Sequence, residues 1–155
     1  MKSFGRIGRT TPFILLLSVR PPALAAEMTG QWLFASDGTG IEIHACSADS
    51  TALCATITTL PRDAAELSGD QRAVLCGSLL MGDLRRAAAK ASEKRLRGWI
   101  VDPAARLHSG SPPRHEVGVL QMSDGRVRIE VHGPLGVVVE RYPLERPAAP
   151  IVNCR

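Results

Sequence analysis

The sequence predicts an all-β fold, a small antiparallel up-and-down β-barrel of about eight strands. Short runs in which apolar and polar residues alternate are typical of half-buried strands, and turn residues separate these runs at short intervals. Aromatic residues make up only 4% of the 155-residue chain, so the predicted core is aliphatic. Closing such a meander removes its two edge strands, and eight strands either fill the interior with side chains or enclose one small ligand.

The N-terminal segment 1–25 is predicted to be a cleaved signal peptide. Basic residues precede the apolar run 13–19, and Ala23-Leu24-Ala25 has the small side chains of a cleavage site. The apolar run is far shorter than the ~20 residues that cross a bilayer, so no membrane anchor is predicted. We therefore expect a periplasmic or secreted protein.

The charge of the mature chain argues against one class of partner. Segment 1–25 holds four basic residues and no acidic residue, so its removal lowers the formal net charge from +4 to zero. A chain without excess positive charge lacks the general electrostatic footprint of a nucleic-acid-binding protein. No nucleic-acid partner is therefore predicted.

The mature chain is predicted to form one barrel domain, 26–146, followed by a proline-rich tail, 147–155. Alternation is clear where Ile41 and Ile43 alternate with polar residues, after an Asp-Gly turn that favours a tight hairpin. It is equally clear on both sides of the later turn 123–125. The predicted strands are 31–35, 40–46, 53–60, 74–81, 95–101, 116–122, 126–132 and 137–144.

The middle of the chain is predicted to be less regular. A single helical turn is expected within 63–67, before the strand at 74–81. The segment 83–95 has high helix propensity but almost no apolar stripe, so we predict a partly helical surface excursion between two strands. After the strand that contains Trp99, glycine and proline residues predict a loop over 104–114.

Four cysteines, all in the predicted mature part, indicate disulfide bonds in an oxidising compartment. Of the three possible pairings, spacing favours Cys46–Cys54, because these residues lie at facing ends of adjacent predicted strands. Closing so short a loop stabilises a protein by roughly 2.5 kcal/mol. Cys76–Cys154 then follows by elimination and would hold the C-terminal tail. A zinc site is not predicted, because the chain has no Cys-x-x-Cys motif and its cysteine spacing does not suit a compact tetrahedral site.

Three motifs near the start of the mature chain carry a family resemblance. The run Gly30-x-Trp32, then Ile41-x-Ile43-x-x-Cys46 and Leu53-Cys54-x-x-Ile57, resembles the opening of a family of small secreted bacterial proteins, the domain of unknown function two-one-four-seven family. Weaker similarity continues to Glu145-Arg146 and covers most of 28–146. The resemblance implies a lipocalin-like barrel exported to the periplasm, with no established activity. The chain resembles a divergent member of this family, because it lacks the family's usual Asn-Pro-Asp-like segment, here 67–74, and its later tyrosine and tryptophan.

The Gly-x-Trp start also resembles that of lipocalins, in which a tryptophan at the barrel base packs beneath a basic residue from the last strand. This resemblance implies that Trp32 packs against Arg146 or, as the second choice, Arg141. We interpret Trp32 and Arg146 as structural residues, because a tryptophan that plugs the closed end of a barrel contributes packing and cation–π contact.

Side chains that could support catalysis do not converge in the predicted fold. His44 and His132 fall on outward-facing strand positions, and His108 and His115 lie in a predicted loop, so neither a metal site nor a cofactor is predicted. Ser109 follows His108, but no Gly-x-Ser-x-Gly elbow surrounds it. The sequence therefore favours a non-catalytic protein.

The leading functional interpretation is a lipocalin-like protein that binds a small apolar or amphipathic ligand inside the barrel. An open interior larger than roughly 300 Å³ would favour this interpretation. The residues predicted to face the ligand are the interior-facing apolar positions of the strands: Trp32, Ile41, Ile43, Ile57, Leu79, Trp99, Val119, Val127, Ile129 and Val139.

The alternative is an envelope interaction or structural protein with a filled barrel, which would act through its surface. Its contact with the envelope would be peripheral and would use the one basic cluster of the mature chain, although a solvated face is the simpler interpretation of that cluster. The cluster consists of Arg85, Arg86, Lys90, Lys94, Arg95 and Arg97.

Overall fold

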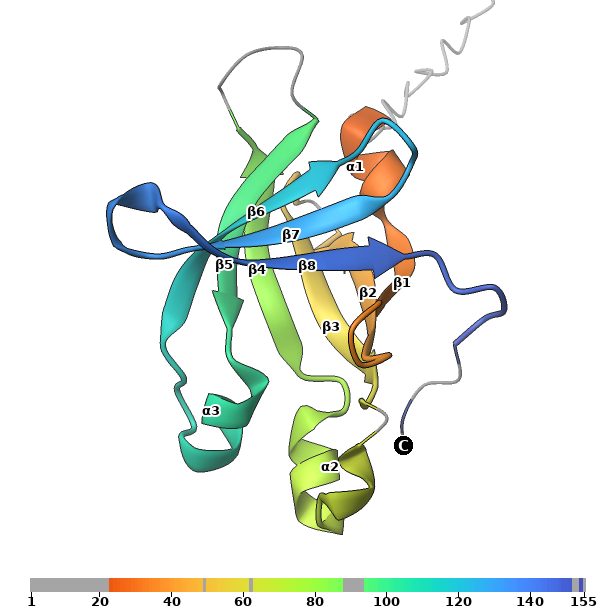
Figure 1. The fold of residues 1–155 in the computed structure, drawn as a ribbon, viewed down its shortest axis with the longest axis vertical. Helices are drawn as coiled ribbons and strands as arrows, with labels where there is room; N and C mark the ends of the chain where they lie inside the picture. Colours follow the sequence, from red (N-terminus) through yellow and green to blue (C-terminus); the bar gives the residue numbers. More distant parts are fainter. Residues whose placement is uncertain (1–22, 49, 62, 88–93, 152–153, 155) are drawn as a thin grey trace, which may run out of the picture.

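The computed structural model shows a closed barrel of strands with short helices at its two ends (Figure 1). Residues 1–22 of the predicted signal peptide and Lys90 of the basic cluster lie outside the described residues. No helix in the described part of the chain is long and apolar enough to span a membrane. The described residues are 23–48, 50–61, 63–87, 94–151 and 154.

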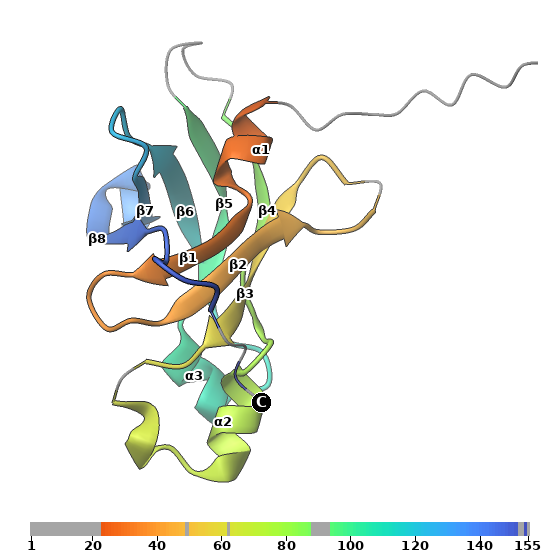
Figure 2. The ribbon, with the colours of Figure 1, turned by 90° about the vertical axis from the view of Figure 1, so that its right-hand side faces the viewer.

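The eight strands follow one another around the barrel, and every neighbouring pair is antiparallel (Figures 1 and 2). Strand β8 pairs with β1 through Leu33–Glu145 and Phe34–Leu144, which closes the barrel. The predicted all-β up-and-down barrel is confirmed. The strands are β1 (Gly30–Phe34), β2 (Gly40–Ala45), β3 (Leu53–Thr59), β4 (Leu79–Arg86), β5 (Arg95–Val101), β6 (Arg114–Gln121), β7 (Val127–His132) and β8 (Val138–Glu145).

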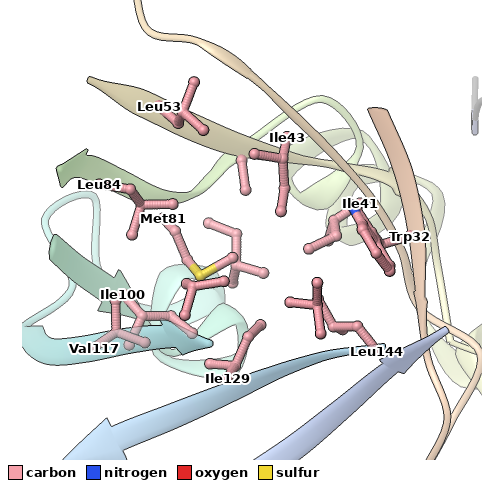
Figure 3. Packing of buried hydrophobic residues seen from close by; sticks show 14 of the residues in the cluster. Trp32, Ile41, Ile43, Leu53, Met81, Leu84, Ile100, Val117, Ile129 and Leu144 are labelled. Atoms are coloured by element: carbon pink, nitrogen blue, oxygen red, sulfur yellow. The ribbon is translucent and has the colours of Figure 1, made fainter. Parts of the chain in front are cut away.

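The core lies inside the barrel and is largely aliphatic. Figure 3 shows side chains from opposite walls pointing toward one another, among them Ile43, Met81 and Ile129. These three residues are at most 1% exposed. Complete burial of an aliphatic side chain stabilises a fold by about 1.5–3 kcal/mol, so this packing is the main contribution to stability.

Both predicted disulfide bonds are present. Cys46–Cys54 closes the connection between β2 and β3, with Cα atoms 4.9 Å apart. Cys76–Cys154 joins the residue after helix α2 (Gly69–Leu75) to the C-terminal tail, with Cα atoms 5.8 Å apart. Two disulfides indicate an oxidising, extracytoplasmic environment.

The C-terminal tail returns along the outside of the first three strands. The amide of Ile151 donates to the side-chain oxygen of Gln31 on β1, at 3.0 Å. The amide of Cys154 donates to the carbonyl of Thr58 on β3. The tail is therefore held by hydrogen bonds as well as by its disulfide.

The strand predicted at 74–81 begins later than expected. Helix α2 occupies its first residues because Ser68 and Gln71 cap the helix start reciprocally, each side chain accepting a hydrogen bond from the other's backbone amide. After the helix, Gly77 has a positive φ of 71°, and the backbone becomes extended only at Leu79.

The predicted helical excursion 83–95 is wrong over its first part, because 83–86 belongs to β4. Helix propensity is overridden there by backbone pairing of β4 with β3 and β5. Asp83 has a positive φ of 51° where the β4–β5 register shifts, which is the geometry of a β-bulge. The segment 88–93 lies outside the described residues.

The predicted loop 104–114 contains a helix, α3 (Pro103–His108). The Asp102 carboxylate caps it by accepting a hydrogen bond from the Ala104 amide at 2.8 Å, and Pro103 occupies the first turn. The turn predicted within 63–67 is confirmed as the 3-10 helix η1 (Ala64–Glu66). Figure 1 shows α2 and α3 at one end of the barrel and α1 (Ala23–Met28) at the other.

Candidate functional site

The barrel end next to α1 is closed by Trp32 and Arg146. Trp32 is 1% exposed, and its indole donates to the Met28 carbonyl at 2.8 Å. The Arg146 guanidinium carbon lies 3.7 Å from the centre of the Trp32 ring, so the predicted partner is Arg146 rather than Arg141. Gly30, with a φ of 100°, leaves room for this guanidinium. A Cβ atom at this position would lie only 3.0 Å from a terminal nitrogen of Arg146.

Arg146 also joins the end of the barrel sheet to the segment that enters it. Its two terminal nitrogens donate to three backbone carbonyls, those of Glu27 (2.9 Å), Thr29 (3.0 Å) and Gln31 (3.2 Å). These bonds and the stack on Trp32 leave no room for a ligand at this end. A candidate binding site must therefore lie elsewhere.

A cavity of about 450 Å³ lies at the opposite end, the open end beside α3. Its walls come from β1, β4, β5, β6, β7 and β8, and its rim comes from the β1–β2 turn and the start of α3. Apolar side chains form most of the surface, and polar groups gather at the rim. The lining residues are Phe34, Ser36, Asp37, Thr39, Leu80, Ile100, Val101, Asp102, Pro103, His115, Val131, Val139, Glu140 and Tyr142.

Strand register explains which side chains enter the cavity. Residues directly opposite each other in an antiparallel pair point to the same face. Glu140 and Tyr142 of β8 lie opposite Val131 and Ile129 of β7, which are buried in the barrel. Glu140 and Tyr142 therefore face inward. By the same rule His115 of β6, which lies opposite the buried Ile100, faces the cavity.

Glu140 and Tyr142 form a hydrogen-bonded pair at the mouth of the cavity, in which the phenol donates to the carboxylate. This hydrogen bond raises the pKa of Tyr142 to about 12, with further contributions from burial and from the negative charges of Glu140, Asp102 and Asp37. The Tyr142 ring also meets Phe34 edge to face, with ring centres 5.8 Å apart. The cavity thus combines an aromatic wall with a carboxylate.

Two further carboxylates stand at the rim. Asp37 accepts a hydrogen bond from the Thr39 amide at 2.8 Å within the β1–β2 turn, and Asp102 caps α3. Among the described residues, neither these two nor Glu140 has a lysine or arginine within ion-pair distance. The negative charge of the rim is therefore not neutralised by a neighbouring cation within the described chain.

Seven of the ten residues predicted to face a ligand lie in the packed core instead of lining the cavity. All seven are at most 3% exposed. The half of the barrel next to α1 is therefore filled, and the cavity lies at the other end. The seven are Trp32, Ile41, Ile43, Ile57, Val119, Val127 and Ile129.

The other three predicted wall residues do not lie in the barrel core. A register shift between β3 and β4 leaves Leu79 half-buried opposite Thr56 and places Leu80 in the wall. Val139 is 59% exposed at the cavity rim, because the inward positions of β8 are the even-numbered ones up to Leu144. Trp99 lies on the outer face, because the inward positions of β5 are those of Leu96 and Ile100, which belong to the buried core cluster.

Trp99 covers a glycine on the outside of the barrel. Gly82 of β4 is its direct partner, and a Cβ atom at Gly82 would collide with the indole ring. Arg114 stacks on the same ring, with its guanidinium carbon 4.0 Å from the ring centre. Trp99 is thus part of a surface stack and is not available to a ligand in the cavity.

Acidic residues accompany the predicted basic cluster. Where the ion pair that a described basic residue forms with a neighbouring carboxylate is exposed, it contributes little to stability. The pairing does, however, reduce the positive charge that an anionic surface would meet. The hydrogen bond from Lys94 holds the pKa of Glu27 below its ordinary value. Envelope contact through this cluster stays a prediction. The pairs, with their N–O distances, are Arg85–Asp83 (2.6 Å), Lys94–Glu27 (2.9 Å), Arg95–Glu130 (3.5 Å) and Arg97–Glu116 (3.7 Å).

Glu130 was missed by sequence reasoning and is the buried centre of an outer-face ion cluster. It is 3% exposed and faces outward on β7. Arg128 approaches it to 2.9 Å, Arg95 to 3.5 Å and Arg141 to 3.6 Å. No group of three metal-ligating side chains is present among the described residues.

Comparisons with protein-family models, with curated proteins and with solved structures find no match to this chain. The cavity is therefore interpreted from its own residues. It combines an aromatic wall, an aliphatic floor and a carboxylate rim.

Proposed function

We propose that this protein binds a small amphipathic molecule in the cavity at the open end of the barrel. One observation carries the proposal: a cavity of about 450 Å³ whose inner wall is apolar and whose rim is polar. Small-molecule sites typically enclose about 300–1,000 Å³ and combine an apolar lining with a few polar groups. The filled core behind the cavity gives it a rigid floor, so the site is preformed.

The oxidising, extracytoplasmic environment and the resemblance to lipocalins support a carrier or sensor of such a molecule outside the cytoplasm. The disulfides agree with the predicted export, and periplasmic location remains part of the proposal. We also propose that the protein is lipocalin-like, as the resemblance of its Gly-x-Trp start implies. In this case the ligand occupies only the mouth of the barrel, because Trp32 and its neighbours fill the base.

Cavity-filling variants test the proposal with the neutral fluorescent probe N-phenylnaphthylamine. Val131→Trp places a large ring in the cavity wall, and Val139→Trp does so at the exposed rim, where folding is not at risk. Val74→Trp, an exposed site on α2 away from the cavity, is the matched control. We expect both cavity variants to lose most of the probe binding while the control keeps it. Equal binding by all four proteins would contradict the proposal.

A second function, docking to an apolar surface of the envelope, is favoured by the tip between β7 and β8, residues 134–137. Leu135 is 100% exposed with a positive φ of 64°, and Val137 is 61% exposed. A strained, exposed leucine beside an exposed valine is a recurrent feature of interaction sites. If the tip binds lipid, wild-type protein floats with liposomes and Leu135→Asp does not. Failure of the wild type to float would exclude lipid docking.

A further inference from the structure

We infer that the cavity selects a cationic amphipath, an organic amine or quaternary ammonium whose charged group lies among Glu140, Asp37 and Asp102 while its apolar part contacts the barrel wall. This inference rests on the proposed function, because it names the chemical class of ligand for the same cavity. It is carried by the sign of the charge at the cavity, by the aromatic wall and by the positions of the three carboxylates.

The charged groups that line the cavity are of one sign. Three carboxylates line it, and no lysine or arginine does. His115 is the one histidine among the lining residues. Clefts lined by one sign of charge concentrate ligands of the opposite sign, so an anionic amphipath is disfavoured here.

The three carboxylates come from separate elements and line the same cavity. Glu140 is on β8, Asp37 is in the β1–β2 turn, and Asp102 begins α3. All three affect the pKa of the Tyr142 hydroxyl, which therefore marks the place where their fields overlap. A cation placed near that hydroxyl is attracted by all three.

The cavity wall suits an organic cation in a second way. Phe34 and Tyr142 meet edge to face with an interplanar angle of 73°, so they present ring surfaces in different directions around one corner of the cavity. Aromatic faces attract ammonium groups, and recognition of quaternary ammonium by such walls is common. Leu80, Ile100 and Val131 continue the wall with aliphatic surface for the rest of the ligand.

The spread of the carboxylates favours an organic cation over a bare metal ion. No three acidic, histidine or cysteine side chains of the described chain lie close enough to hold one metal ion. A metal site needs several ligands at about 2.0–2.6 Å from one point. An alkylammonium group, in contrast, needs only a negative field and an apolar wall.

Three probes of equal chain length test the inference: hexylammonium, hexanol and hexanoate, each titrated calorimetrically into the full protein. We expect hexylammonium to bind about tenfold more tightly than hexanol, and hexanoate to bind most weakly. Raising the salt concentration should weaken hexylammonium binding and leave hexanol binding unchanged.

Two isosteric variants locate the charge effect. Glu140→Gln and Asp37→Asn should each weaken hexylammonium binding several-fold without changing hexanol binding. Glu145→Gln, at the end of the same strand and outside the cavity, should change neither. The Asp37 variant keeps the oxygen that accepts the Thr39 hydrogen bond, so a fold defect is not expected.

The outcomes separate the two claims. Equal binding of hexylammonium and hexanol, with both weakened by Val139→Trp, would overturn the charge selectivity and leave the cavity as a binding site. Tighter binding of hexanoate would overturn the selectivity outright. Absence of binding for all three probes and for N-phenylnaphthylamine would overturn the proposed function itself.

Discussion

Replacing Glu140 with glutamine should lower the pKa of Tyr142 while leaving the barrel intact. The carboxylate accepts the phenol hydrogen bond and supplies the nearest negative charge, and these effects, with burial, raise the pKa of Tyr142 to about 12. A hydrogen bond to a charged group contributes about 1.5–3 kcal/mol, and one pKa unit corresponds to about 1.4 kcal/mol. The variant should therefore titrate at least about one pH unit lower.

Tyr142 is the single tyrosine of the chain, so its ionisation can be followed directly by ultraviolet absorbance. The wild-type protein should give one phenolate transition near pH 12, and Glu140→Gln should shift it toward the ordinary value near 10. Glu145→Gln lies outside the cavity and should titrate like the wild type. A wild-type transition near pH 10, or no shift in Glu140→Gln, would refute the geometry at the cavity mouth.

The same shift has a consequence for stability. The folded-state pKa of Tyr142 lies above its unfolded-state value, so the unfolded chain loses this proton first as pH rises. The stability contributed by the protonated phenol is complete below about pH 10 and is lost as pH rises toward 12. In Glu140→Gln, the pH range over which this stability is lost should be narrower, as denaturation experiments at a series of pH values would show.

Three further changes test the packing of the barrel by urea denaturation. Arg146→Ala removes the Trp32 stack and three carbonyl hydrogen bonds at an exposed site, and should cost about 2 kcal/mol of unfolding free energy. Gly82→Ala forces a methyl group against Trp99 and should lower the free energy of unfolding by about 2 kcal/mol. The same substitution should cost much less in a protein that also carries Trp99→Ala. Cys154→Ser opens a disulfide that spans 78 residues and should cost about 4 kcal/mol.

Each of these changes has its own control. Arg126→Ala removes an exposed pair with Asp124 and should leave the free energy of unfolding almost unchanged, so equal losses for both arginine variants would contradict the role given to Arg146. For Gly82, additive losses in the double variant would show that the Trp99 ring is not the obstacle. For Cys154, stability that is insensitive to the serine substitution under oxidising conditions would show that the tail is not held by this bond.

The fold was predictable because its signals are local. Strand β2 and the β6–β7 hairpin show alternation and turn residues within a few positions, and such signals specify strands without knowledge of their partners. The Cys46–Cys54 pairing followed from the facing ends of two adjacent predicted strands, and Cys76–Cys154 followed by elimination. The errors arose where a local capping interaction or a strand partner overrides propensity, as in α2 and in 83–86.

The cavity could not be predicted because it depends on which way β8 faces. The run 137–139 consists of three valines, so period-two alternation does not reveal which residues point inward. Pairing with β7 decides it and turns Glu140, a charged residue, toward the interior. A charged residue at an inward position breaks the local pattern, and such exceptions are expected at functional or strained sites.

The closed end was predicted only in outline. The resemblance implied the contact between Trp32 and Arg146, but the hydrogen bonds of Arg146 go to backbone carbonyls, which carry no sequence signal. The burial of Glu130 was likewise unpredictable, because it requires arginines from three strands to meet over one carboxylate.

Methyl-resolved NMR of the protein titrated with N-phenylnaphthylamine tests the central claim most directly, because the aromatic probe shifts the methyl signals that it contacts. A ligand in the cavity mouth should shift Leu80, Ile100 and Val131 and leave the core residues Ile43 and Ile129 unchanged. Shifts centred on the core methyls, or no shifts at any of these positions, would contradict a binding site at the open end of a filled barrel.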